Sequence, residues 1–181
     1  MMHRKSREIA FGGVLCALAT AILLLGGVIP IATYCAPLLA MLALLPVLEE
    51  FGTKPAWTAY AAVSLLALAL AADKELAAVY LFFGYYPMVQ PAFDRIRLRG
   101  IRMSAKLGYF NAAAAALYAL LIRLFAVDAV AREFHGMSGA FLLTLILLGN
   151  GLFFATDLVL GRMRLLWKLK LRHLVFRGKN P

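Results

Sequence analysis

Long apolar runs, separated by short polar or charged segments, make up almost the whole of this chain. An apolar run of about 20 residues is long enough to cross the hydrocarbon core of a bilayer as a helix. The pattern predicts six such spans, at about 9–28, 36–51, 55–72, 76–89, 107–127 and 138–160. The fourth run is the shortest and has Pro87 near its end, so it suits a short, a tilted or a partly re-entrant helix.

The basic segment from Asp94 to Lys106 sets the orientation of these spans. Its cations are Arg95, Arg97, Arg99, Arg102 and Lys106, and loops rich in Lys and Arg stay in the cytoplasm. With six spans, 16 of the 19 Lys and Arg residues fall on that side, and Lys74, Arg123 and Arg132 fall outside. The sequence therefore predicts one all-α, multi-pass domain over 1–181, in a bacterial-type plasma membrane, with both termini cytoplasmic.

The tail, 161–177, is predicted to be a basic amphipathic helix that continues the sixth span along the cytoplasmic surface. Arg164, Lys168 and Arg172 recur every four residues and so lie on one helical face. We expect anionic lipid headgroups at this tail and at the basic segment. A docking surface for a partner protein is the alternative.

Composition supports the membrane class. The chain is 64% hydrophobic and 15% charged, whereas about a quarter of the residues in soluble domains are charged. The net charge of +10 does not indicate nucleic-acid binding, because the cations flank the apolar spans. The chain has no HExxH, GxSxG or P-loop motif, and its two cysteines have no metal-ligand spacing. We therefore expect no enzyme, no catalytic residue, no metal and no cofactor.

The first span carries small residues on one face, at Ala10, Gly13, Ala17 and Ala21. Small faces let helix backbones approach closely in lipid. Two interpretations are open: the face packs against another span of this chain, or it meets a different membrane subunit.

Polar side chains are rare within the predicted spans, so each one is informative. The amide of Asn150 needs a partner, either on a neighbouring helix or on a bound molecule. Carboxylates at the cytoplasmic ends of spans are expected to form ion pairs with nearby cations such as Lys54, Arg95 and Arg162. Glu49 and Glu50 end a helix, where the dipole disfavours negative charge, so a cation from elsewhere is expected to meet them. Near the outer side we expect either interfacial anchors or a pocket, formed by Tyr34, Tyr80, Tyr118 and Arg123.

The segments 4–10 and 13–21 are similar to the start of many substrate-binding (S) components of energy-coupling factor transporters. The turn at 28–31 and the following Pro37-Leu38-Leu39 also resemble the first outer loop and second helix of that family. The resemblance implies capture of a vitamin-like micronutrient from outside. It also implies a separate membrane coupling subunit, which the small face would meet, and two ATPase subunits. The substrate pocket would be lined by Tyr34, Tyr80, Tyr118, Arg123 and Asn150.

Two other classes fit the same sequence. One is a non-transporting membrane scaffold whose basic segments dock a partner, and the other is a small lipid-handling membrane protein. The outer half has few polar groups, which suits a small, aromatic or lipid-like substrate. An outer cavity would favour transport, and a filled helical core would favour the scaffold.

Overall fold

The computed structural model describes residues 2–29, 32–124 and 139–172. Within these ranges the chain is helical and has no β-strand, so the all-α prediction is confirmed. The chain divides into two compact units: unit 1 comprises residues 1–88 and 158–181, and unit 2 comprises residues 89–157. Arg132, which the sequence places on the outer side, and the end of the predicted tail helix lie outside the described residues.

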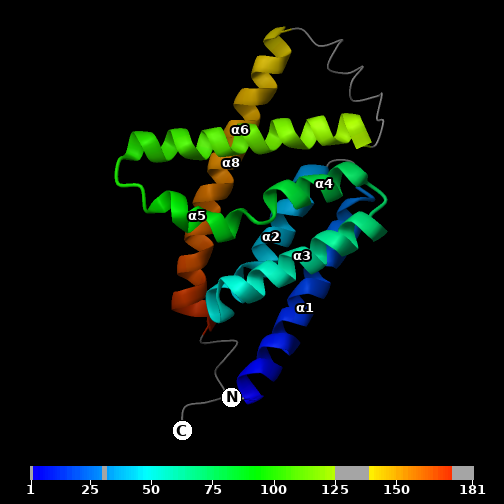
Figure 1. The fold of residues 1–181 in the computed structure, drawn as a ribbon, viewed down its shortest axis with the longest axis vertical. Helices are drawn as coiled ribbons and strands as arrows, with labels where there is room; N and C mark the ends of the chain where they lie inside the picture. The colour runs from blue at the N-terminus through cyan, green and yellow to red at the C-terminus, as the bar shows by residue number, and fades with distance from the viewer. Residues whose placement is uncertain (1, 30–31, 125–138, 173–181) are drawn as a thin grey trace. The chain divides into compact units, whose positions relative to one another are not determined.

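Unit 1 is built on four helices that pack side by side (Figure 1). They are α1 (Met2–Gly26), α2 (Ala32–Phe51), α3 (Thr53–Leu70) and α4 (Lys74–Phe83). Gly52 has φ 89°, in the left-handed region, and it reverses the chain between α2 and α3. Asp73 caps α4, since its carboxylate accepts the backbone N–H groups of Glu75 and Leu76.

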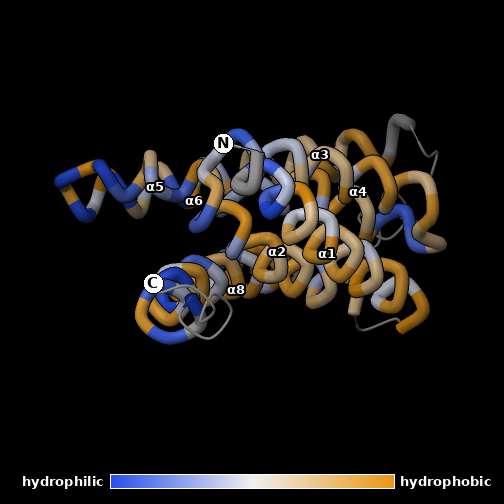
Figure 2. The backbone as a smooth tube through the Cα atoms, turned by 90° about the horizontal axis from the view of Figure 1, so that it is seen from below, coloured by the Kyte–Doolittle hydropathy of each residue, from blue (hydrophilic) through white to orange (hydrophobic). Residues whose placement is uncertain are grey.

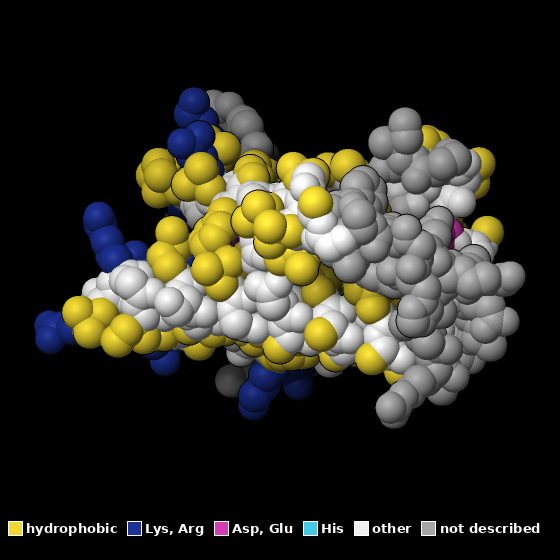
Figure 3. Space-filling view, turned by 90° about the horizontal axis from the view of Figure 1, so that it is seen from above, with side chains coloured by type: hydrophobic (Ala, Val, Ile, Leu, Met, Phe, Trp, Pro, Cys, Tyr) yellow, Lys and Arg dark blue, Asp and Glu magenta, His cyan; other side chains and the backbone are white. Residues whose placement is uncertain are grey.

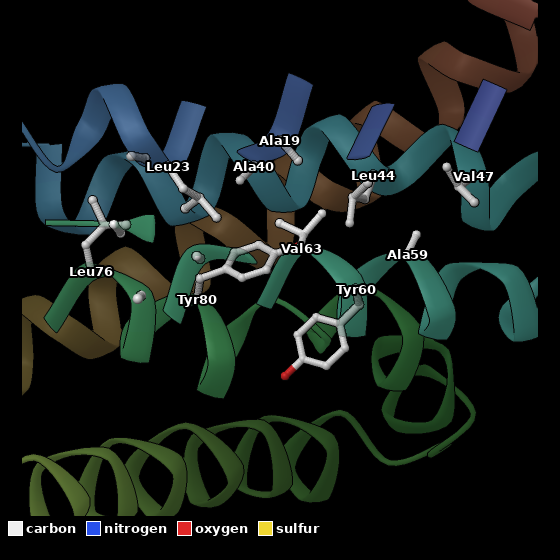
Figure 4. Close-up of a cluster of buried hydrophobic side chains, with 14 residues drawn as sticks. Ala19, Leu23, Ala40, Leu44, Val47, Ala59, Tyr60, Val63, Leu76 and Tyr80 are labelled. Atoms are coloured by element: carbon white, nitrogen blue, oxygen red, sulfur yellow. The ribbon is translucent and has the colours of Figure 1, made fainter. Parts of the chain in front are cut away.

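The core of unit 1 lies between these helices (Figure 4). Alanines at the contacts, such as Ala19 and Ala40, let the helices approach closely. Leu23, Val63 and Tyr80 fill the space between them and are completely buried. The Tyr80 ring centroid lies 5.9 Å from that of Tyr60.

The span predicted at 76–89 is not one continuous helix. The chain forms α4, which ends at Phe83, and then α5 (Tyr86–Asp94). Pro87 has no N–H to donate to the carbonyl of Phe83, so the helix cannot run on regularly. At the break a Cβ on Gly84 would lie 2.6 Å from the backbone oxygen of Tyr80, so only glycine fits there.

In unit 2, α6 (Arg99–Leu124) crosses the first part of α8 (Gly139–Leu166), as Figure 1 shows. The fifth span was predicted to start at 107, but α6 begins at Arg99, where the N–H of Arg102 donates to the carbonyl of Leu98. Most of the basic segment is therefore helical rather than a loop, because arginine, isoleucine and methionine are compatible with a helix.

Beyond the predicted last span the chain stays helical as far as the described residues extend. After Leu166 the helix runs on as a π-helical segment, η1 (Trp167–Leu171). Segments of this type are rare and often mark functional positions.

Three helical stretches among the described residues are long and apolar enough to cross a membrane: Lys5–Gly26, Ala32–Phe51 and Leu143–Lys170. Large apolar side chains also lie exposed on α1 and α8, among them Ile9, Val14, Leu147 and Leu148. Figure 2 shows the same apolar character along α1 and α2. Exposed apolar area of this extent is unusual for a soluble protein and indicates membrane association.

Candidate functional site

The carboxylates at the end of α2 meet the cations of the tail. Arg164 Nε lies 3.4 Å from Glu49 Oε1 and Lys168 Nζ lies 3.2 Å from Glu49 Oε2. Arg172 Nε lies 3.1 Å from Glu50 Oε1. We call these five residues the tail ion-pair cluster. The expected cation from elsewhere is thus confirmed, but it comes from the four-residue repeat of the tail and not from Lys54 or Arg162.

Trp167 also contacts Glu50 of the tail ion-pair cluster, and it packs near Phe11 of α1. Its ring is buried, with its centroid 6.3 Å from that of Phe11 on α1. The indole N–H donates to Glu50 Oε1 over 3.1 Å. Trp167 is therefore an internal contact between the tail, α1 and α2.

A second charged cluster lies in unit 2 and is centred on Lys106. The ammonium lies 2.8 Å from Asp94 Oδ1 and 2.7 Å from Asp157 Oδ2, and the residue is only 4% exposed. Gln90 Nε2 donates to Asp157 Oδ1 over 2.6 Å and to the Asp157 carbonyl over 3.1 Å. We call these four residues the Lys106 cluster. It joins α5, α6 and α8, and it carries one net negative charge.

Asn150 finds its partner on a neighbouring helix, which was one of the two expected outcomes. Asn111 Nδ2 donates to Asn150 Oδ1 over 3.0 Å, and Asn150 Nδ2 donates back over 3.4 Å. Each amide also donates to a carbonyl one turn earlier, on Leu107 or Ile146. The pair joins α6 to α8 through polar groups, next to the close approach of Phe110 to Gly149.

The five residues predicted to line a pocket divide between the two units. In unit 1, Tyr34 is exposed and its hydroxyl donates to Glu75 Oε1 over 2.8 Å. Tyr80 is fully buried, and its hydroxyl has no hydrogen-bond partner among the described residues. In unit 2, Tyr118 is half-buried on α6, Asn150 forms the amide pair, and Arg123 lies in α6 with its side chain outside the described part.

Unit 1 also contains a narrow apolar crevice. The crevice is lined by Met41, Leu44, Leu45, Leu48, Ala56, Tyr60, Gly84, Pro87 and Met88. The Tyr60 hydroxyl already donates to the carbonyl of Leu81. The lining is therefore suited to apolar groups.

The small face of α1 is exposed. Ala10, Gly13, Ala17 and Ala21 all lie at the surface, and no heavy atom approaches within 4 Å of a Cβ placed on Gly13. α1 packs on α2 and α3 through its other side, which includes Ala19 and Leu23. Within unit 1, therefore, the described residues leave this face exposed.

Sequence reasoning missed the role of Lys106 and Gln90. Lys106 was grouped with the solvated cations of the basic segment, although it follows Ala105 and precedes a long apolar run. Gln90 is a single amide between Val89 and Pro91, which could have suggested a buried hydrogen-bonding role. Neither sequence position indicates that Asp157 is the shared partner of these two side chains.

No family model, curated protein or solved structure matches the chain. Its function is therefore inferred from its own residues.

Proposed function

We propose that this chain is the membrane-embedded substrate-capture subunit of an uptake transporter for a vitamin-like micronutrient. Separate coupling and ATPase subunits supply the energy. The observation that carries the proposal is the exposed small face of α1, at Ala10, Gly13, Ala17 and Ala21. A helix whose small-residue face is exposed within its own unit is suited to meet a helix of another subunit.

The proposal places six crossings in a plasma membrane, with both termini cytoplasmic and the fourth crossing broken between α4 and α5. Contacts within unit 1 support this order. At one end, Thr33 donates to Asp73 and Tyr34 donates to Glu75, which brings the starts of α2 and α4 together. The other end of α2 meets the basic tail through the tail ion-pair cluster. These two ends correspond to the outer and the cytoplasmic sides in the proposed topology.

The proposed substrate is small and largely apolar, with few hydrogen-bonding groups. The resemblance assigns the pocket to Tyr34, Tyr80, Tyr118, Arg123 and Asn150, of which Tyr34 and Tyr80 lie in unit 1. The apolar lining of the crevice in unit 1, which includes Met41, Leu44 and Met88, supports a substrate of this kind.

The test is co-purification from the native membrane after mild extraction. Ala17→Leu adds bulk to the small face, and we expect it to lower recovery of the coupling and ATPase subunits at least tenfold. Ala62→Leu, at an exposed position of α3, is the matched control and should recover them like the wild type. Equal recovery with both variants, or a wild-type protein that brings down no other subunit, would count against the proposal.

A second candidate, a non-transporting membrane scaffold, is favoured by one observation. Leu23, Val63 and Tyr80 fill the core of unit 1 and have no exposed surface. A scaffold needs no pocket, so thermal unfolding across a panel of vitamins separates the two candidates. Stabilisation by one compound, lost in Asn150→Ala and retained in Thr156→Ala, supports capture. An unchanged unfolding temperature with every compound supports the scaffold, and tightly retained phospholipid would indicate lipid handling instead.

A further inference from the structure

Four arginines between α5 and α6 and in the first turn of α6 have no ion-pair partner among the described residues. They are Arg95, Arg97, Arg99 and Arg102. The acidic residue next to them, Asp94, is held by Lys106. The Lys106 cluster thus uses the nearest carboxylate, and no other described carboxylate pairs with the four arginines.

The tail is basic too, but its cations are differently placed. Arg164, Lys168 and Arg172 each pair with a glutamate of α2. Among the described residues, four cations of the basic segment have no ion-pair partner, whereas in the tail this holds for Arg162 and Lys170.

Apolar side chains alternate with the four arginines. Leu98, Ile101 and Met103 are 64%, 55% and 50% exposed. Figure 3 shows dark blue and yellow side chains next to one another over the connection between α5 and α6, at the left of the view. The tube in Figure 2 shows the same mixture of hydrophilic and apolar residues there. We call these seven residues the arginine surface.

The start of α6 favours an anion as well. Its first turn contains no acidic residue, and Arg99 and Arg102 lie at the end of the helix where the dipole is positive. Cations at that position destabilise a helix unless an anion compensates them. An arginine guanidinium binds a phosphate oxygen pair through two parallel hydrogen bonds.

We propose that the arginine surface binds the headgroups of acidic phospholipids, with Leu98, Ile101 and Met103 inserted among the first acyl carbons. The inference rests on the membrane location proposed above and not on substrate capture. A bilayer provides partners for both parts of the surface. The guanidinium groups bind lipid phosphates, and the apolar side chains are removed from water. An acidic peptide or free phosphate would leave the three apolar side chains exposed.

The test measures lipid preference in detergent solution by native mass spectrometry, with phosphatidylglycerol and phosphatidylcholine in competition. Arg95→Gln with Arg97→Gln removes two charges from the arginine surface. Lys168→Gln with Arg172→Gln removes two charges that are already paired, and it is the matched control. Each basic residue near an anionic surface contributes about a fivefold preference. The first pair should therefore lower the preference for phosphatidylglycerol by roughly tenfold or more, and the second should change it less than about twofold.

Two further measurements complete the test. Leu98→Ser with Ile101→Ser should weaken retention of both lipids, because insertion is lost while the charge is kept. High salt should reduce the preference of the wild type, since exposed charges are screened.

Several results would overturn the inference. They are equal losses in the two charge-removing pairs, no preference in the wild type, or displacement of the lipid by inorganic phosphate or polyglutamate at equal charge concentration. A lipid preference that persists in a protein without coupling subunits would leave this inference intact while the transport proposal fails.

Discussion

The ammonium of Lys106 lies 2.7 Å from the Oδ2 atom of Asp157, and these residues are 51 positions apart in the sequence. The lysine comes from a strongly basic segment of the chain, yet its side chain is 5% exposed. It therefore acts as an interior counter-ion for α8 and α5, not as a surface charge.

Lys106→Met should destabilise the protein by about 3–5 kcal/mol, because it leaves Asp157 and Asp94 near one another without a cation. Chemical unfolding in detergent, followed by circular dichroism, measures the loss. Arg102→Met is the control, since Arg102 has no ion-pair partner among the described residues. Adding Asp157→Asn to Lys106→Met should recover part of the stability, and a Lys106→Met protein as stable as the control would show that the cluster contributes nothing.

The stabilisation that the ion pair of Glu50 and Arg172 contributes should decrease as the salt concentration rises. Arg172 is 61% exposed, so screening and side-chain entropy limit the pair to about 1 kcal/mol or less. Glu50→Ala removes this pair and the acceptor of the Trp167 indole. In a Trp57→Phe background, Trp167 fluorescence should shift to longer wavelength in Glu50→Ala as the ring becomes more exposed. Glu75→Ala should leave the emission of Trp167 unchanged, and a shift of the same size there would point to a general loss of structure.

The Asn111–Asn150 amide pair should show coupling in a double-mutant cycle. Hydrogen bonds between helices in a membrane contribute about 0.6 kcal/mol on average and up to about 1.7 kcal/mol. We expect Asn150→Leu alone to destabilise the protein, and Asn111→Leu with Asn150→Leu to cost less than the sum of the single changes. Additive single effects would mean that the two amides act independently.

Gly84→Ala should destabilise the protein by about 1–3 kcal/mol, since the new methyl group would clash with the Tyr80 backbone oxygen at the end of α4. Gly108→Ala is the matched control, because nothing lies within 4 Å of its added Cβ and the residue is inside α6. That change should stabilise the protein by up to about 1 kcal/mol through helix propensity. Thermal unfolding of both variants checks the sign of each effect. An unchanged unfolding temperature in Gly84→Ala would show that the backbone between α4 and α5 shifts to fit a methyl group at little cost.

Helix content and the position of most helices could be predicted from the sequence because they depend on local pattern. The apolar runs of α1, α2 and α8 were predicted within a few residues at most ends. The sequence marked the fourth span as irregular near Pro87, but it did not indicate the close approach of Gly84 to the backbone and ring of Tyr80, because that contact depends on packing. The start of α6 was wrong because charge was taken as a sign of a loop, whereas arginine is a good helix former.

The sequence alone determined that this protein is helical and apolar enough for a membrane, and that its cations gather in two regions. These properties follow from runs and periodicities within single segments. Only the tertiary structure decided which charges are neutralised. Glu50 and Trp167 are 117 residues apart, and Asn111 and Asn150 are 39 apart, so no local pattern specifies their partners. The packing of the helices selects those pairs, and among the described residues it leaves the small face of α1 exposed and the four arginines at the start of α6 without an ion pair.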